Sequence, residues 1–217
     1  MKNTPRIFID ADLAHGAQIH ATRDVVHYMR RVMRTSDCVV FGAGDEFSAH
    51  LDDNDVLNIG PSTGRTDPSG DMTLMFAPIK RTDDLINMAT QMGVAHLQPV
   101  ITDRTNAHHI NWDRMRKIAI EASEQSNRNS VPDILPPVRF SDLDLSGIVF
   151  ADERAAHGAT IASHVDSTRI LVGPEGGFSD TEFAALDAAG ARGISLGKTI
   201  LRAELAAAIA LEKIRKQ

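Results

Sequence analysis

Cysteine is almost absent from this sequence, because Cys38 is the only one among its 217 residues. A single cysteine excludes a disulfide framework and a zinc site built from several cysteines. No apolar run approaches the roughly 18–20 residues that a membrane span needs, which excludes an integral membrane protein. The first residues lack an apolar signal segment and include Asp10, so no secretory signal is expected. With 42% hydrophobic residues available for a core, these absences predict a soluble, globular, cytoplasmic protein.

Positive charge is also in short supply. The 23 Lys and Arg residues against 29 Asp and Glu residues give a net charge of −6, the wrong sign for binding nucleic acid by bulk electrostatics. An RNA-binding role therefore requires a local basic patch. A helix is expected over residues 24–33, where apolar residues at helical spacing leave the arginines on the opposite face. The candidates for the patch are Arg23, Arg30, Arg31 and Arg34, although the same pattern also fits a solvated helix face.

The N-terminal part of the chain is expected to form a small, mostly β module. Its predicted strands are residues 6–9, 38–41 and 47–51. The stretch at 60–70 contains three Gly, two Pro and no apolar side chain, so it is predicted to be a linker or hinge. We therefore expect two domains, at residues 1–68 and 69–217.

Beyond residue 70, strand-like and helix-like segments alternate, which predicts a parallel α/β sheet with helices on its faces. The expected strands are residues 73–77, 94–101, 148–151, 169–172 and 193–196. Helices are expected after Thr82, after Asn111, over 155–165, after the capping box of Ser179 and Glu182, and over 202–216. Ligands of open α/β sheets bind at the carboxyl ends of strands, so we look for chemistry in the loops after 151, 172 and 196.

Several familiar ligand motifs are missing. The segment 193–199 ends like a phosphate-binding P-loop, but it has three residues between its glycines where that loop needs four, so an NTPase is excluded. No G-x-G-x-x-G sequence supports a dinucleotide site. His108 and His109 lack a third ligand at suitable spacing, so they are interpreted as surface histidines and no metal site is expected.

The most informative segments are G-P-E-G-G-F-S at 173–179 and L-G-K-T-I-L-R-A-E at 196–204. Three glycines within five positions let a backbone approach a ligand closely, although a tight strand-to-helix turn also explains them. Together with E-A-S-E-Q-S-N-R at 121–128, these segments resemble the RsmE family of SPOUT methyltransferases, which methylates N3 of a uridine in 16S ribosomal RNA. The chain departs from the family pattern at Leu205, where threonine is usual.

The resemblance implies a SPOUT-type α/β trefoil-knot domain preceded by a PUA-like RNA-binding domain. It implies a homodimer that binds S-adenosylmethionine in the C-terminal loops, no metal, and a 16S rRNA substrate in the small ribosomal subunit. The cofactor-binding residues carried over are Leu171, Gly173, Pro174, Glu175, Gly176, Gly177, Leu196, Gly197, Ile200 and Leu201.

The resemblance also suggests which residues act on the RNA. Arg202 could stabilise negative charge on the uracil or hold a phosphate, and Glu204 could accept a proton or orient Arg202. A simple ion pair at a helix start remains an alternative for these two residues. Gln125 and Arg128 are candidate RNA contacts, against the alternative of helix capping. Two other functions stay open: a weakly catalytic or non-catalytic ribosome-assembly factor, and a SPOUT enzyme acting on another RNA position.

Overall fold

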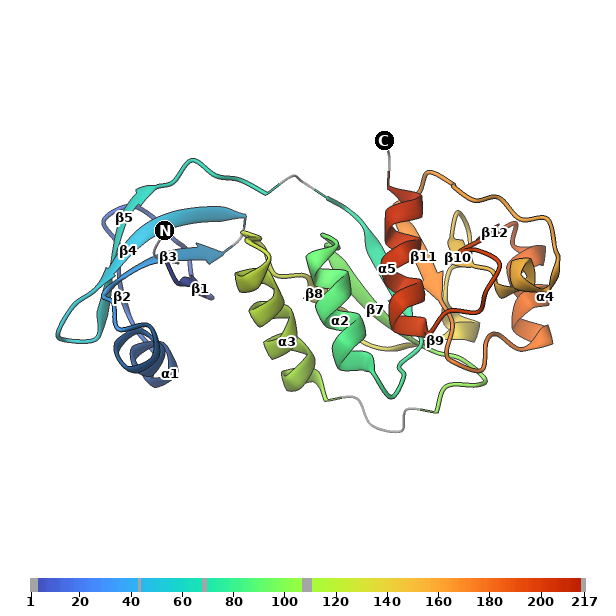
Figure 1. The fold of residues 1–217 in the computed structure, drawn as a ribbon, viewed down its shortest axis with the longest axis horizontal. Coiled ribbons are helices and arrows are strands. Elements are labelled where there is room, and N and C mark those ends of the chain that lie inside the picture. The colour runs from blue at the N-terminus through green and yellow to red at the C-terminus, as the bar shows by residue number, and fades with distance from the viewer. Residues whose placement is uncertain (1–3, 43, 68–69, 107–110, 216–217) are drawn as a thin grey trace. The chain divides into compact units, whose positions relative to one another are not determined.

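The chain divides into two units that are described separately below (Figure 1). A computed structural model describes residues 4–42, 44–67, 70–106 and 111–215. The first unit comprises residues 1–69 together with 120–131, and the second comprises 70–119 and 132–217. The sequence assigned 120–131 to the second domain, and the boundary predicted after residue 68 falls outside the described residues. Among the helices that are described, none is both long and apolar enough to cross a bilayer.

A mixed five-stranded sheet forms the first unit. Its strand order is β1-β3-β4-β5-β2, with β1 parallel to β3 and the other neighbours antiparallel. The strands are β1 (Arg6–Phe8), β2 (Gln18–His20), β3 (Asp37–Gly42), β4 (Asp45–Leu51) and β5 (Val56–Ser62). Met29 is fully buried in the apolar core of this unit, which also contains Cys38. Burial, with Asp37 as a lesser cause, raises the pKa of Cys38 to about 12, so this thiol stays protonated and unreactive.

The helix expected over 24–33 is only partly α-helical. Helix α1 spans Arg23–His27 and continues as a π-helical turn, η1, over Tyr28–Met33. A π-turn adds a residue per turn and so breaks the 3.6-residue spacing of the apolar side chains. This explains why Val32, expected on the buried face, is 59% exposed.

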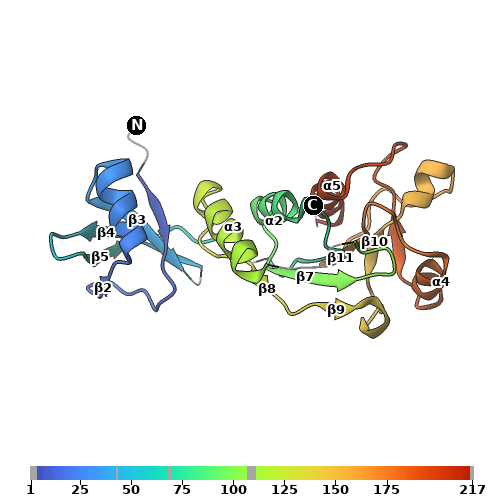
Figure 2. The same ribbon diagram turned by 90° about the horizontal axis from the view of Figure 1, so that it is seen from below.

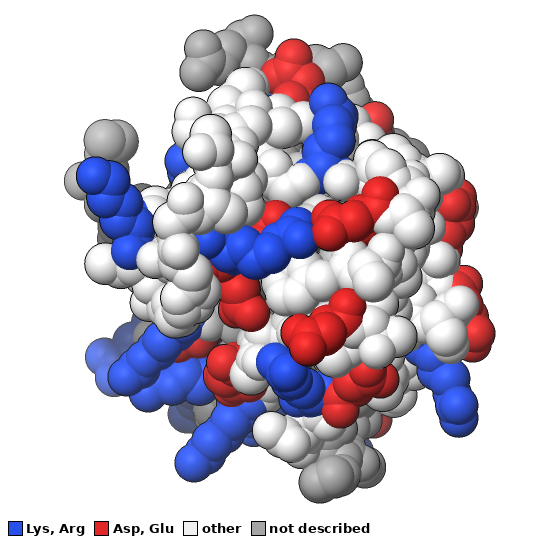
Figure 3. Space-filling view, turned by 90° about the vertical axis from the view of Figure 1, so that its right-hand side faces the viewer, with Lys and Arg blue, Asp and Glu red and all other residues white. Residues whose placement is uncertain are grey.

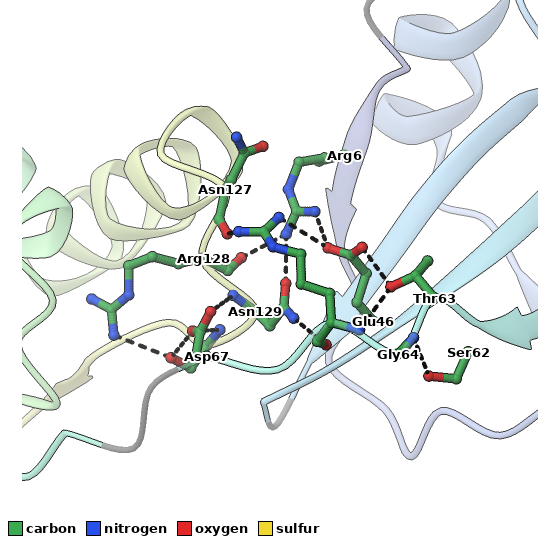
Figure 4. A network of polar contacts seen from close by, with 11 residues as sticks. Arg6, Glu46, Ser62, Thr63, Gly64, Asp67, Asn127, Arg128 and Asn129 are labelled. Carbon is green, nitrogen blue, oxygen red and sulfur yellow. Dashed lines mark hydrogen bonds and ion pairs between the residues drawn. The ribbon is translucent and has the colours of Figure 1, made fainter.

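The linker expected over 60–70 contains the boundary between the two units, after residue 69, but its first part is tied into the first unit. Residues 60–62 complete β5, and the residues that follow are tied to the turn at 127–130 by the polar network in Figure 4. Asp67 accepts hydrogen bonds from the backbone N–H groups of Asn129 (2.7 Å) and Ser130 (2.9 Å). Asn129 Nδ2 in turn donates to the carbonyl of Arg65 at 2.8 Å. The local composition suggested a conformationally free backbone here, but hydrogen bonds to residues distant in sequence fix it.

A parallel sheet forms the second unit, as the alternating pattern predicted. Its order is β12-β10-β11-β6-β7-β8, with β9 also paired to β7, and every pairing is parallel. The strands are β6 (Thr73–Phe76), β7 (His96–Ile101), β8 (Asp133–Ile134), β9 (Val138–Arg139), β10 (Val149–Ala151), β11 (Arg169–Val172) and β12 (Arg192–Ile194). The short strands β8 and β9 were not among the strands expected from the sequence.

Helices cover this sheet and agree with most of the predicted helix starts. They are α2 (Thr82–Gln91), α3 (Trp112–Gln125), α4 (Asp180–Ala188), α5 (Ala203–Ile214) and the 3-10 turns η2 (Phe140–Asp142) and η3 (Glu153–His157). Helices α2 and α5 pack together on one face (Figure 2). Leu186 of α4 joins an aromatic core with Phe150 and Phe178. The predicted capping box is confirmed, because Ser179 and Glu182 cap α4 reciprocally.

Two predictions about helices in this unit were wrong. Residues 155–165 are not an α-helix, because η3 ends at Gly158, whose φ of +96° terminates the helical path. The carbonyl of Ala162 then accepts a hydrogen bond from the backbone of Ser195 at 2.7 Å, so this alanine-rich stretch pairs with another loop. Thr82 is the first residue of α2 and not its cap; its hydroxyl instead bonds the backbone of Ile79.

Candidate functional site

A pocket opens at the carboxyl ends of three neighbouring strands of the parallel sheet. The loops that follow β10, β11 and β12 converge on it, and it holds about 610 Å³, including the part open to solvent. This volume suits a small-molecule ligand. It is lined by Ala151, Asp152, Glu153, Ala156, Val172, Gly173, Pro174, Glu175, Gly177, Phe178, Leu196, Gly197, Thr199, Ile200, Leu201, Ala203 and Ala206.

The glycine loop after β11 forms one wall of this pocket. Gly177 has a φ of +68°, and its N–H donates to the carbonyl of Pro174 at 2.9 Å, which closes a tight turn. A Cβ atom on Gly177 would overlap the carboxylate of Glu153. A Cβ atom on Gly173 would lie 3.2 Å from the ring of Phe178. Glycine is therefore required at 177 both by the backbone conformation and by the side chain lying against it.

The charge of the lining is one-sided. Asp152, Glu153 and Glu175 contribute three carboxylates, and the described residues that line the pocket include no Lys or Arg. The remaining lining side chains are mostly apolar. A phosphate-bearing ligand would meet like charge in this pocket, whereas a compact cation with an apolar body meets complementary groups.

Arg154, which does not line the pocket, forms an ion pair with one of these carboxylates. Asp152 is buried, and it accepts hydrogen bonds from Arg154 Nε at 2.9 Å and from Arg154 Nη2 at 2.7 Å. The same guanidinium donates to both carboxylate oxygens of Asp187 on α4, at 2.8 and 3.1 Å. These bonds raise the pKa of Arg154, with Asp152 the larger cause, and lower that of Asp187.

A loop after β7 lies across the outer side of the glycine loop. Arg104 is exposed, and its Nη1 donates to the carbonyl of Gly176 at 2.7 Å. Asp103 accepts from the hydroxyl of Ser179 at 2.6 Å, and its own N–H donates to Glu182 at 2.9 Å. The capping box of α4 therefore also anchors this loop, which brings a basic side chain to the carboxyl edge of the sheet.

Most of the residues expected to bind a cofactor line this pocket: Gly173, Pro174, Glu175, Gly177, Leu196, Gly197, Ile200 and Leu201. Two lie elsewhere. The side chain of Leu171 is fully buried in the aromatic core of the second unit. Gly176 faces Arg104, since a Cβ atom there would lie 3.5 Å from that side chain.

The two residues of the expected catalytic pair differ in their surroundings. Arg202 is exposed at the N-cap of α5, between the lining residues Leu201 and Ala203. Glu204 is buried, and its carboxylate lies 4.0 Å from Arg81 Nη1. This geometry gives Glu204 a structural neighbour at the start of α2, while Arg202 stands at the rim of the pocket.

The expected RNA contacts all belong to the first unit. Arg23, Arg30, Arg31 and Arg34 are exposed, and Arg30 forms an ion pair with Asp55 at 2.8 Å. The second unit shows a different surface: on the face that carries α4, acidic and basic side chains are interspersed (Figure 3).

The two expected RNA contacts at the end of α3 differ in accessibility. Gln125 is exposed, whereas Arg128 is half-buried and donates to the hydroxyl of Ser130 at 3.1 Å. Burial lowers the pKa of Arg128, against the opposing effect of Asp67.

The sequence interpretation missed Asp152, Glu153, Arg154 and Arg104. Their signal was positional, because each lies within three residues of the carboxyl end of β10 or β7, where ligand-binding side chains collect. His108 and His109 lie outside the described residues. Within the part of the chain that is described, no cluster of three or more His, Cys, Asp or Glu residues could hold a metal ion.

The pocket lies on a parallel sheet, and residues 66–215 match the family model described as "RNA methyltransferase domain". Together these findings define the class of the protein as RNA methyltransferase. A Rickettsia conorii protein named Ribosomal RNA small subunit methyltransferase E is 33% identical over 97% of this chain and 94% of its own length. A Synechocystis protein of the same name is 28% identical over 91% of this chain and 73% of its own length.

Structural comparison agrees with these relatives. The crystal structure of a Ribosomal RNA small subunit methyltransferase E from Neisseria gonorrhoeae bound to S-adenosyl methionine has a TM-score of 0.84 and 26% identity, covering 97% of this chain and 96% of that one. The chain belongs to the ribosomal RNA small subunit methyltransferase E family, as its sequence motifs predicted.

Proposed function

We propose that this protein transfers the methyl group of S-adenosylmethionine to N3 of a uridine in the 16S rRNA of the small ribosomal subunit, in the cytoplasm. The observation that carries the proposal is the carboxylate-lined pocket at the carboxyl ends of β10, β11 and β12, in a chain of this family. When bound, S-adenosylmethionine supplies an electrophilic methyl group on a positively charged sulfur.

The residues present fit that cofactor. Glu153 and Glu175 offer negative charge to a sulfonium and an ammonium group and acceptors to ribose hydroxyls, whereas the charge of Asp152 is paired with Arg154. Leu196, Leu201 and the other apolar lining residues suit a neutral adenine ring. The absence of a side chain at Gly177 lets the carboxylate of Glu153 lie against the glycine loop, in space that a Cβ atom would occupy. A dinucleotide or a nucleoside triphosphate would lack any cationic partner among these lining residues.

The methyl-accepting nitrogen must lose a proton, and negative charge develops on the uracil as it does so. Arg202 and Arg104 are exposed at this edge of the sheet, so we assign them to binding the uracil oxygens or a neighbouring phosphate. We assign Glu204 to positioning, because it is buried beside Arg81. Orientation of the base against the methyl group supplies much of the acceleration in this scheme.

The first unit is assigned as a PUA-like RNA-binding domain. Its mostly β fold and the exposed arginines at 23, 30, 31 and 34 support this assignment, with Gln125 and Arg128 as further contacts. RNA binding through such phosphate contacts is expected to weaken steeply with salt.

A homodimer with a trefoil knot completes the proposal. Ile200 and Leu205 are 66% and 45% exposed beside the pocket, and a second copy would cover such large apolar side chains. Support for the knot comes from the loop 158–168, which bonds both to Ser195 beyond β12 and to Ile214 of α5.

Glu153→Gln tests the electrostatic part of the cofactor site. Glutamine keeps the shape but removes the charge, so affinity for S-adenosylmethionine is expected to fall by about tenfold, the low end for an interaction with a charged group. S-adenosylhomocysteine has no sulfonium charge, so its affinity should change less. Calorimetric titration with both ligands measures the difference. Glu212→Gln is the matched control, because Glu212 is an exposed glutamate of α5 that does not line the pocket. Equal losses for the two ligands in Glu153→Gln would contradict the assignment.

Arg202→Ala tests the transfer reaction itself. Small subunits from cells lacking the modification are incubated with labelled S-adenosylmethionine, and the nucleosides are identified by mass spectrometry. Wild-type protein should produce 3-methyluridine, and Arg202→Ala should reduce kcat roughly a hundredfold, as removal of one oxyanion donor does. Cofactor binding should be retained. Arg192→Ala, an exposed arginine at the start of β12, serves as the control.

The nucleoside formed also separates the alternative functions. A methylated nucleoside other than 3-methyluridine would assign the enzyme another RNA position. Cofactor binding without any methylated nucleoside would favour an assembly factor built on the same fold.

A further inference from the structure

The side chain of Arg154 makes several interactions next to the pocket that have no role in the methyl transfer described above. It follows β10 but does not line the pocket, whereas the two residues before it, Asp152 and Glu153, both do. Its guanidinium lies between Asp152 on one side and Asp187 of α4 on the other. It also stacks on the ring of Phe183 in α4, with the guanidinium carbon 4.6 Å from the ring centroid.

The contacts on the Asp152 side of Arg154 fix the position of the Asp152 carboxylate. Its carboxylate receives bonds from Arg154 Nε, from Nη2 and from the Arg154 backbone N–H at 3.0 Å. Its own backbone N–H donates to Ile194 of β12 at 3.0 Å. On the remaining side it lies against Gly193, where an added Cβ atom would come within 2.5 Å of the carboxylate. A buried carboxylate in such a site is stable only while its cationic partner stays in place.

The contacts on the other side of Arg154 reach helix α4, which follows the glycine loop that forms another wall of the pocket. Helix α4 begins directly after the glycine loop 173–179, and Asp187 and Phe183 both lie on it. The two forked bonds to Asp187 and the stacking on Phe183 therefore couple the loop after β10 to the element that supports the glycine loop. Only a planar guanidinium presents donors to two carboxylates at once in this way.

We propose that Arg154 is a positioning residue of the cofactor pocket, which holds Asp152 and the loop after β10 in register with helix α4 and the glycine loop. The proposal rests on the proposed function, since it assigns this pocket to S-adenosylmethionine. Arg154 touches neither cofactor nor RNA in this scheme and acts through Asp152 and Glu153.

Arg154→Met and Arg154→Lys test the proposal in the full-length protein. Both are expected to raise the Kd and the KM for S-adenosylmethionine by about tenfold to a hundredfold, the scale of a misplaced site. The KM for the small-subunit RNA should stay unchanged. Lysine should rescue little, because it keeps the charge but cannot make the fork. Full rescue by lysine would overturn the proposal, because it would show that charge alone matters.

Two further variants separate positioning from general stability. Gly193→Ala crowds Asp152 while leaving Arg154 intact, and it should raise the same Kd and KM. Arg169→Met is the matched control, because Arg169 bonds the carbonyls of Asp144 and Ser146 at the amino end of β11. All binding is measured well below each variant's Tm.

The possible outcomes distinguish this proposal from the proposed function. A lower Tm for Arg154→Met with wild-type Kd and KM would show a purely structural residue and overturn the inference. If wild-type protein itself fails to bind S-adenosylmethionine, the assignment of the pocket fails instead.

Discussion

Replacing Gly177 by alanine is expected to weaken S-adenosylmethionine binding by tenfold or more. The new Cβ atom would overlap the carboxylate of Glu153 and push that side chain into the pocket. Overpacking of this kind costs about 1–3 kcal/mol, which corresponds to roughly a five- to 150-fold change in affinity, with tenfold near the lower end. Titration calorimetry with the purified variant measures this loss.

The chain offers a closely matched control for this variant. Gly190, at the end of α4, has a φ of +69° against +68° for Gly177, but a Cβ atom there would meet nothing within 4 Å. Gly190→Ala therefore carries the same left-handed backbone strain, about 1–2 kcal/mol, without the overlap. Gly190→Ala should lose the stability that the backbone strain alone costs, and only Gly177→Ala should lose cofactor affinity. Equal affinities would show that Glu153 moves aside without entering the pocket.

Replacing Glu46 by glutamine is expected to lower the free energy of unfolding of the first unit by about 3–5 kcal/mol, the cost of leaving a buried charge unpaired. Glu46 forms an ion pair with Arg6, and the two side chains are 6% and 10% exposed. Arg6 also donates at 2.8 Å to the carbonyl of Arg128 and to Asn129 Oδ1 (Figure 4). The loss should therefore extend to the turn at 127–130.

This contribution should depend on pH in a defined direction. Burial by itself raises the pKa of Glu46, but hydrogen bonds from Arg6 and Thr63, with the charges of Arg6 and Arg65, bring it below its ordinary value. A carboxylate whose pKa is lower in the folded state stabilises above its unfolded pKa of about 4.3. That stabilisation is lost as the pH falls through the lower folded value. The difference between wild type and Glu46→Gln should accordingly disappear in acid.

Urea unfolding at several pH values measures this effect. Tyr28, the only tyrosine, reports on the first unit, and Trp112, the only tryptophan, reports on the second. Glu124→Gln is the control, because burial raises the pKa of Glu124 and its charge is unfavourable in the fold. Glu124→Gln should therefore be neutral or stabilising near neutral pH. A Glu46→Gln loss that persists undiminished in acid would contradict the ion-pair explanation.

Local patterns in the sequence determined much of the second unit. The alternation of strands and helices predicted a parallel sheet, and the capping box at Ser179 and Glu182 marked the start of α4 to the residue. Both are short-range effects, since strand period and cap chemistry act over a few residues. The segments at 173–179 and 196–204 identified the family, which the comparisons confirm.

Where sequence reasoning failed, long-range contacts had overridden local propensity. The stretch at 60–70 has the composition of a linker and does contain the boundary between the two units, yet its residues Thr63 and Asp67 are bound to Glu46 and to the turn at 127–130. The alanine-rich segment 155–165 favours a helix, but its backbone instead pairs with Ser195. Neither partner is close enough in sequence to leave a local signal.

By itself, the sequence determined the family, the parallel sheet of the second unit and the loops in which a ligand site was expected. Only the tertiary structure decided which side chains meet there. It placed Glu153 against Gly177, joined Asp152 through Arg154 to Asp187, and buried Glu204 beside Arg81 while leaving Arg202 exposed. The physical reason is that strand and helix periodicities act between near neighbours, whereas a pocket's charge and shape depend on residues brought together from distant segments.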